Sequence, residues 1–156
     1  MTQEEKDLLI KDLSARVRHG VKFHYHMEGD NSHKEGVYVA TIDSINTDTV
    51  EFIYEEESGW LRDWCCPIEE VRPFLRPLSD ITEEEEKELD KHYLCTIIGN
   101  HITLRYHSDG YWDNDTEVEL KDYLWLEDWL NSHYFDYRGL IELDLAEKVG
   151  KEKYEK

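Results

Sequence analysis

A helical pattern rich in aromatic residues, between Glu117 and Ile141, constrains the fold of this chain more than any other stretch. It contains two of the five Trp residues. The pattern predicts a long helix at the centre of the fold, and Gly139 predicts the turn that closes it. At 100° per residue, one broad stripe of this helix collects these apolar and aromatic side chains: Leu120, Tyr123, Leu124, Leu126, Leu130 and Tyr134.

Two Trp residues lie beside each other on a flank outside that stripe, because Trp125 and Trp129 are four positions apart. Two interpretations stay open for them. The strands of a sheet can cover them, which would make them core. Alternatively, together with Tyr111 and Trp112 and the neighbouring acids, they form a partner-binding surface, since Trp and Tyr bring large contact area at low entropic cost.

The charge of the chain bears on its partners. Its 156 residues include 37 acidic and 18 basic side chains, a formal net charge of −19, with 39% apolar and 12% aromatic residues. The apolar content predicts a globular fold with a real core. The negative field repels phosphate, so direct binding of DNA, RNA or an anionic membrane is disfavoured.

Neither export nor membrane insertion is expected. No apolar run approaches the roughly 18–20 residues that span a bilayer. The opening sequence, MTQEEKDLLIKDL, is typical of an acidic helix and not of an export signal. The cysteines Cys65, Cys66 and Cys95 are an odd set with two adjacent members, which is a poor framework for disulfides. We therefore expect a reduced cytoplasm.

The first half of the chain predicts one helix followed by a sheet. Thr2 and Glu5 have the spacing of a capping box, and Gly20 is placed to end the helix. Short alternating segments then predict four antiparallel strands, which can curl into a small SH3-like barrel. The expected strands are Val21–His26, Val37–Ile42, Val50–Tyr54 and Trp60–Cys66.

The second half predicts two helices that pack on this sheet. Thr82 with Glu85 predicts a second capping box, which opens an acidic helix ending near Tyr93. Residues 95–105 are expected to form one strand or a β-turn-β element, and the central helix follows. The fold class is therefore α+β, in a single domain of residues 1–156 whose tail, residues 142–156, is partly frayed.

Two groups of residues have side chains that bind metals. His24 and His26 share one face of a strand, where a third ligand would be needed, and solvent-facing histidines are the simpler interpretation. The second group consists of His92, Cys95, His101 and His107, and its spacing matches no established zinc pattern. We expect neither a bound metal nor a cofactor, and a metal-dependent enzyme stays an alternative.

The sequence contains no motif that indicates catalysis by a nucleophile. There is no Gly-x-Ser-x-Gly elbow and no glycine-rich phosphate loop. Cys65 and Cys66 are thiols, but no neighbour in sequence predicts a lowered pKa for either. No catalytic residue is therefore predicted.

Acidic residues are dense in two stretches, with seven between Asp80 and Asp90 and seven between Asp113 and Asp128. Solvated helix faces are the simpler interpretation. The alternative is a surface that imitates the phosphates of nucleic acid and occupies the basic groove of a nucleic-acid-binding protein. The acids expected to do so are Glu83, Glu84, Glu86 and Asp90.

Three segments resemble a known group of proteins: PFLRPLSDITEEE (Pro73 to Glu85), DWLNSHYFDYRGLI (Asp128 to Ile141) and the opening MTQEEKDLLIKDLSARVRHGVK. The group consists of small uncharacterised acidic proteins of gut bacteria and of their phages and mobile elements. The resemblance implies a cytoplasmic accessory protein carried by such an element, and it transfers neither an activity nor a site residue. The leading prediction is a non-enzymatic interaction protein that binds a protein partner through acidic and aromatic surface.

Overall fold

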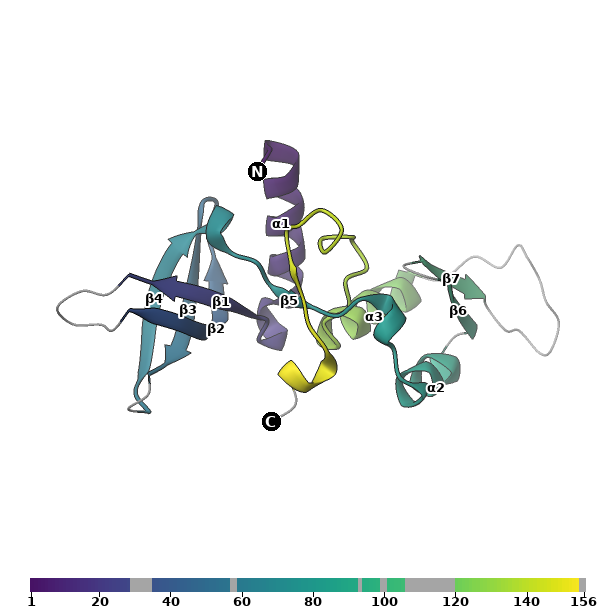
Figure 1. Ribbon diagram of the computed structural model, residues 1–156. Helices are drawn as coiled ribbons and strands as arrows, with labels where there is room; N and C mark the ends of the chain where they lie inside the picture. Colours follow the sequence, from purple (N-terminus) through teal and green to yellow (C-terminus); the bar gives the residue numbers. More distant parts are fainter. Residues whose placement is uncertain (29–34, 57–58, 93, 99–100, 106–119, 155–156) are drawn as a thin grey trace. The chain divides into compact units, whose positions relative to one another are not determined.

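The computed structural model describes residues 1–28, 35–56, 59–92, 94–98, 101–105 and 120–154 (Figure 1). They group into two compact units. The first comprises Met1–Leu75 and Leu140–Lys148, and the second comprises Arg76–Gly139 and Val149–Lys156. The chain therefore passes between the units more than once, and the organisation as one domain stays a prediction.

The first unit begins with helix α1, Gln3–Arg16. The predicted capping box is confirmed: the backbone N–H of Glu5 donates to Thr2 Oγ1, and the backbone N–H of Thr2 donates to Glu5 Oε2. A 3-10 turn follows, and Gly20 ends it at a φ of 71°, a conformation that glycine adopts without strain.

The buried face of α1 contains an ion pair that the sequence pattern did not predict. Leu9 and Leu13 are fully buried, and so are Asp12 and Arg16, one turn apart. Arg16 Nε donates to Asp12 Oδ2 at 2.7 Å, and Arg16 Nη2 donates to Oδ1 at 3.0 Å. The bidentate geometry compensates both charges inside the unit.

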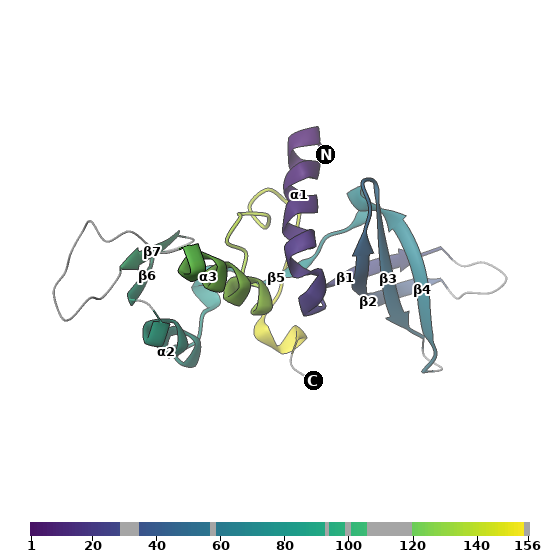
Figure 2. The ribbon, with the colours of Figure 1, turned by 180° about the vertical axis from the view of Figure 1, so that it is seen from behind.

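Four antiparallel strands follow, in the spatial order β1-β2-β3-β4 (Figures 1 and 2). Each connects to the next by a hairpin, as predicted, and a register shift between Ile42 and Ser44 bends β2. With α1 they confirm the α+β class. The strands are β1 (Lys22–Met27), β2 (Gly36–Ile45), β3 (Thr49–Glu55) and β4 (Leu61–Pro67).

One face of the sheet belongs to the core of the first unit. Buried Val50, Phe52 and Tyr54 alternate along β3 with exposed Glu51, Ile53 and Glu55, the period of two that a half-buried strand requires. The Phe23 ring meets Phe52 edge to face, with centroids 5.1 Å apart. This face therefore supplies packing, and the opposite face is left with polar and exposed apolar side chains.

A short parallel pair completes the first unit. Strand β5 (Phe74–Leu75) pairs with β8 (Glu147–Lys148), and the backbone N–H of Glu147 donates to Pro73 O. Ala146 and Val149, which flank β8, are buried. The tail expected to fray thus contributes a strand, although the fraying itself stays a prediction.

The second unit contains two helices and a hairpin. Helix α2 (Glu83–His92) and helix α3 (Leu120–Ser132) meet in one apolar cluster with the segments beside them. Strands β6 (Leu94–Ile98) and β7 (His101–Arg105) pair antiparallel, so the β-turn-β alternative is the one observed. The cluster consists of Leu78, Leu89, Leu126, Trp129, Leu130 and Phe135, with Ile81, Trp125 and Tyr137 packed against it.

The apolar stripe predicted for α3 is correct at Leu126 and Leu130, which are buried, and wrong at Tyr123 and Leu124. The latter are 60% and 58% exposed, whereas Trp129 is 5% exposed. The buried face is therefore rotated toward the tryptophans. Burying an indole removes more apolar area from water than burying a leucine, which favours this rotation.

Helix α3 ends at Ser132, seven residues before the glycine expected to close it, and Tyr134 follows as the residue that turns the chain out of the helix. Tyr134 has a φ of 60°, the left-handed conformation usually left to glycine. Its N–H donates to Asn131 O and that of Phe135 donates to Leu130 O, which is the pattern of a Schellman cap. The Tyr134 ring stacks on Tyr154 with centroids 3.4 Å apart, and this contact helps to hold a conformation that costs a tyrosine energy.

Candidate functional site

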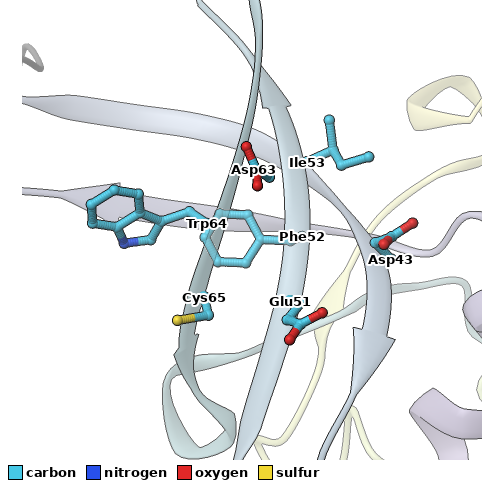
Figure 3. A pocket seen from close by; sticks show the side chains of 7 residues that line it. All are labelled: Asp43, Glu51, Phe52, Ile53, Asp63, Trp64 and Cys65. Carbon is cyan, nitrogen blue, oxygen red and sulfur yellow. The ribbon is translucent and has the colours of Figure 1, made fainter.

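A partly open hollow of about 420 Å³ lies on strands β2, β3 and β4 of the first unit (Figure 3). It combines three carboxylates with aromatic, aliphatic and thiol groups. No Lys or Arg occurs among the described residues that line it. The lining residues are Asp43, Glu51, Phe52, Ile53, Asp63, Trp64 and Cys65.

The strand register and local hydrogen bonds position these acids. Ile53 is the partner of Asp63, and Glu51 is the partner of Cys65, so their side chains share the face opposite Phe52. Ser44 Oγ donates to Glu51 Oε2 at 2.7 Å and fixes that carboxylate. Asp43 lies at the register shift of β2. The result is a concentrated negative surface that can receive a cationic side chain.

Large apolar side chains of β4 and of the turn before it are exposed next to this hollow. Trp60 is 70%, Leu61 68% and Trp64 45% exposed. Trp64 hydrogen-bonds with Tyr25. Burial raises the pKa of Tyr25, although this hydrogen bond lowers it. Exposed tryptophans beside polar groups are typical of protein-binding surfaces.

The two adjacent cysteines differ in their surroundings. Both are free thiols, Cys65 exposed in the hollow and Cys66 buried on the core face of the sheet. Burial raises the pKa of Cys66 to about 12, and the negative charge of Glu70 adds to that shift. Cys66 is therefore a protonated, structural thiol at neutral pH, and not a nucleophile.

Among the described carboxyls of the second unit, that of Glu85, on α2, has a strongly lowered pKa. Arg76 donates to it in a bidentate pair, Nη1 to Oε1 at 2.8 Å and Nη2 to Oε2 at 3.0 Å. Burial alone would raise its pKa, but the Arg76 pair, the Thr82 backbone and the charge of Lys151 lower it to about 2. Glu85 therefore stays ionised, and all its partners belong to the fold.

Arg76 also connects its own segment to the chain that follows helix α3. Its N–H donates to Tyr134 O and its carbonyl accepts from Asp136. Its guanidinium lies 4.4 Å from the centroid of the Phe135 ring. Residues 76–85 and 128–139 thus contact each other within the second unit.

Of the four acids predicted to form the acidic surface, three have exposed side chains and the fourth lies outside the described side chains. Glu83, Glu84 and Glu86 on α2 are exposed, while Glu85 turns inward. The side chain of Asp90 lies outside the described residues. The three exposed acids share the first turns of one helix, and their binding role stays a prediction.

The predicted aromatic surface is partly core. Trp129 stacks on His133, with ring centroids 4.1 Å apart, and lies 5.7 Å from the Phe135 ring. Trp125 is half-buried against the same cluster. Trp129 Nε1 has no hydrogen-bond partner in the described part of the chain. Tyr111 and Trp112 lie outside the described residues.

The histidines of β1 are not equivalent. His24 Nδ1 lies 2.9 Å from Glu147 Oε2, and its ring meets Phe74 edge to face at 4.7 Å. His26 is exposed. Within the described residues, no three His, Cys, Asp or Glu side chains are grouped to hold a metal ion. The other metal candidate, His92, Cys95, His101 and His107, has no described side chains.

Sequence reasoning placed Trp60, Trp64 and Cys65 in a strand but attached no function to them. A usable signal exists, since Trp60, Leu61 and Trp64 put large apolar groups on both faces of one short segment. Only an edge strand with two exposed faces, or a fully buried one, accommodates that composition.

Over the residues that the structure describes, none of the helices combines the length and the apolar character needed to cross a membrane. Comparison of the chain with protein-family models, with curated proteins and with solved structures gives no match.

Proposed function

We propose that this chain is a non-enzymatic interaction protein that binds a protein partner through the acidic and aromatic surface of β3 and β4. One observation carries the proposal: Trp64, which is 45% exposed, lines a hollow together with three carboxylates, and Trp60 and Leu61 shortly before it in the chain are 70% and 68% exposed. Exposed tryptophan supplies binding energy, and the carboxylates supply charge selectivity. The partner therefore carries a cationic surface with an apolar centre. This moves the aromatic part of the predicted surface from α3 to the sheet.

Affinity capture from lysates of gut bacteria tests this function with three baits. The variant that carries Trp60→Ala with Trp64→Ala removes two exposed rings of the proposed surface. The matched control carries Tyr123→Ala with Leu124→Ala, two exposed side chains of α3. We expect a partner that is retained by the parent and the control, and about tenfold depleted by the first variant. Equal capture by all three baits would contradict the proposal.

A nucleic-acid mimic is the second candidate, supported by the exposure of Glu83, Glu84 and Glu86 on one helix. Such a chain would release DNA or RNA from its partner, and added salt would weaken the complex steeply. Replacing these three residues by Gln, and Asp90 by Asn, should abolish the competition. Competition that survives the replacement would exclude α2 as the mimic.

We propose that the sheet curls into a partly open SH3-like barrel in which β4 remains an edge, and the register shift in β2 supports this curl through the bend it introduces. We also propose that the protein is cytoplasmic and that a phage or mobile element carries it. The free thiols of Cys65 and Cys66 support a reducing compartment. The alternative that the chain is a metal-dependent enzyme is tested by elemental analysis of untagged protein. Stoichiometric zinc in that protein would support this alternative.

A further inference from the structure

Strand β4 is an edge whose outer hydrogen-bonding groups have no strand partner among the described residues. Two bonds flanking the β3–β4 ladder fix which groups face outward: Glu56 N–H donates to Trp60 O, and Ile68 N–H donates to Asp48 O. Because antiparallel pairs alternate, the even-numbered residues of β4 bond to β3. The N–H and C=O groups of Leu61, Asp63 and Cys65 therefore point away from the sheet.

This edge is exposed on both faces as well. The side chains from Leu61 to Cys65 are all exposed, and Cys66 is the first buried one. Central strands of a sheet bury at least one face, as β3 does. Edges of this kind are templates for another strand unless charge or proline blocks them. Pro67 limits the open part at one end, which leaves the stretch from Leu61 to Cys66.

We infer that the edge of β4 receives an extended segment of the partner as a fifth strand, with a Lys or Arg side chain opposite Asp63. This inference rests on the proposed function and names how the partner binds. The backbone of the segment would bond to Leu61, Asp63 and Cys65. Its basic side chain would lie beside the carboxylates of the hollow, and its neighbours in sequence would face Trp64 on the other face of the sheet.

A second copy of this chain fits the edge poorly. Antiparallel pairing of β4 with itself centred on Asp63 or on Arg62 places two like charges opposite each other, and pairing centred on Trp64 places Asp63 opposite Cys65, which offers it no positive charge. Like charges directly opposite each other destabilise a strand pair. Each chain also carries a net charge of −19, which repels a copy of itself. The charge of the hollow therefore favours a cationic segment from another protein.

Two pools of nine-residue peptides test the chemistry of the segment. Both carry Val, Ile, Thr or Tyr at alternate positions, with Lys and Arg at the remaining positions in one pool and Asp and Glu in the other. We expect the basic pool to bind the parent protein and the acidic pool not to. Asp63→Lys should weaken basic-pool binding about tenfold. The matched control Glu4→Lys makes the same charge change on exposed α1 and should leave it within about twofold.

Amide hydrogen exchange of the complex with the tightest basic peptide tests the pairing itself. We expect the amides of Leu61, Asp63 and Cys65 to exchange at least about tenfold more slowly when the peptide is bound. Those of Arg62 and Trp64, which already bond to β3, should change much less.

Two results would overturn the inference. Peptide binding with equal protection of odd and even residues of β4 would mean docking on a face and not at the edge. Equal binding of the two pools, or of neither, would refute the cationic strand. Neither result touches the proposed function, which stands or falls on whether partner capture depends on Trp60 and Trp64.

Discussion

Single residues in this chain differ sharply in what they do even when they are neighbours of the same type. Glu84, Glu85 and Glu86 are consecutive, yet only Glu85 is buried and paired with Arg76. Removing its charge would leave the Arg76 guanidinium buried without compensation. At neutral pH we expect Glu85→Gln to lower the free energy of unfolding by about 3–5 kcal/mol. Glu84→Gln, the matched control, should stay within about 0.5 kcal/mol. Urea titration of both variants measures the difference, and equal values would contradict the buried pair.

The same carboxyl predicts a dependence of stability on pH. Its pKa falls from 4.5 to about 2 on folding, so the unfolded chain binds this proton more readily. The stability from Glu85 is therefore complete above about pH 4.5 and is lost as the pH falls toward 2. Between these values, the free energy of unfolding should fall more steeply in the parent than in Glu85→Gln. Parallel acid titrations of the two proteins would contradict this assignment.

The two histidines of β1 give a second residue-scale prediction. His24 contacts Glu147 and Phe74, whereas His26 is exposed. His24→Ala loses a hydrogen bond and a ring contact, and should cost about 1–2 kcal/mol of unfolding free energy. His26→Ala should cost less than about 0.5 kcal/mol. Thermal and chemical unfolding of the pair measures both values. A larger loss of unfolding free energy for His26→Ala than for His24→Ala would mean that the His24 contacts do not hold β1 to the segment of β8.

At the scale of elements, helix α3 offers a matched pair of leucines. Leu130 is 4% exposed in the apolar cluster, and Leu124 is 58% exposed on the same helix. Leu130→Ala removes buried methyl groups and leaves a cavity, so it should cost about 2–5 kcal/mol. Leu124→Ala should cost less than about 0.5 kcal/mol, since alanine also favours a helix. Similar melting temperatures for the two variants would place the buried face of α3 elsewhere.

Elements with local signals were predictable from the sequence. The capping boxes at Thr2 and Thr82 marked where α1 and α2 begin, because their hydrogen bonds lie within four residues. Alternating side chains marked the four strands of the sheet to within a few residues. The prediction of an α+β fold rested on these features and is confirmed.

Elements that depend on distant partners were not predictable. Strand β5 has two residues, and its partner β8 lies more than 70 positions later in the chain. Helical spacing gave the rotation of α3 incorrectly, because Trp129 joins Leu126 and Leu130 on its buried face while Tyr123 and Leu124 are exposed. No local pattern marks Asp12 and Arg16, which are both fully buried and form an ion pair with each other.

The composition of the candidate site was predictable from the sequence, but its position was not. Acidic and aromatic surface was expected, and the hollow on β2–β4 has that composition. Its position was missed because the exposure of Trp60 and Trp64 depends on β4 being an edge, which is a property of the sheet order and not of the strand. Glu83, Glu84 and Glu86 of α2 are exposed, as the sequence suggested.

For the whole molecule, the net charge of −19 opposes compaction when little salt is present. The Debye length shrinks from about 30 Å at 0.01 M to about 10 Å at 0.1 M salt. We therefore expect the melting temperature to rise over that range of sodium chloride. Replacing Glu83, Glu84 and Glu86 by Gln changes the net charge from −19 to −16 and should reduce the rise. A melting temperature independent of salt would contradict the prediction.

The way the chain alternates between the two units has a consequence for its synthesis. All residues of the four-stranded sheet have been synthesised once the chain reaches Pro67. Strand β5, however, pairs with β8, so the first unit lacks this strand pair until Lys148 has left the ribosome. The second unit likewise needs Lys151, which pairs with Glu85, and Tyr154, which stacks on Tyr134. A chain released early, or one clipped before Leu140, therefore leaves both units unfinished at once. In a cell that degrades incomplete proteins, translation therefore has to pass Tyr154 before both units have all of their contacts.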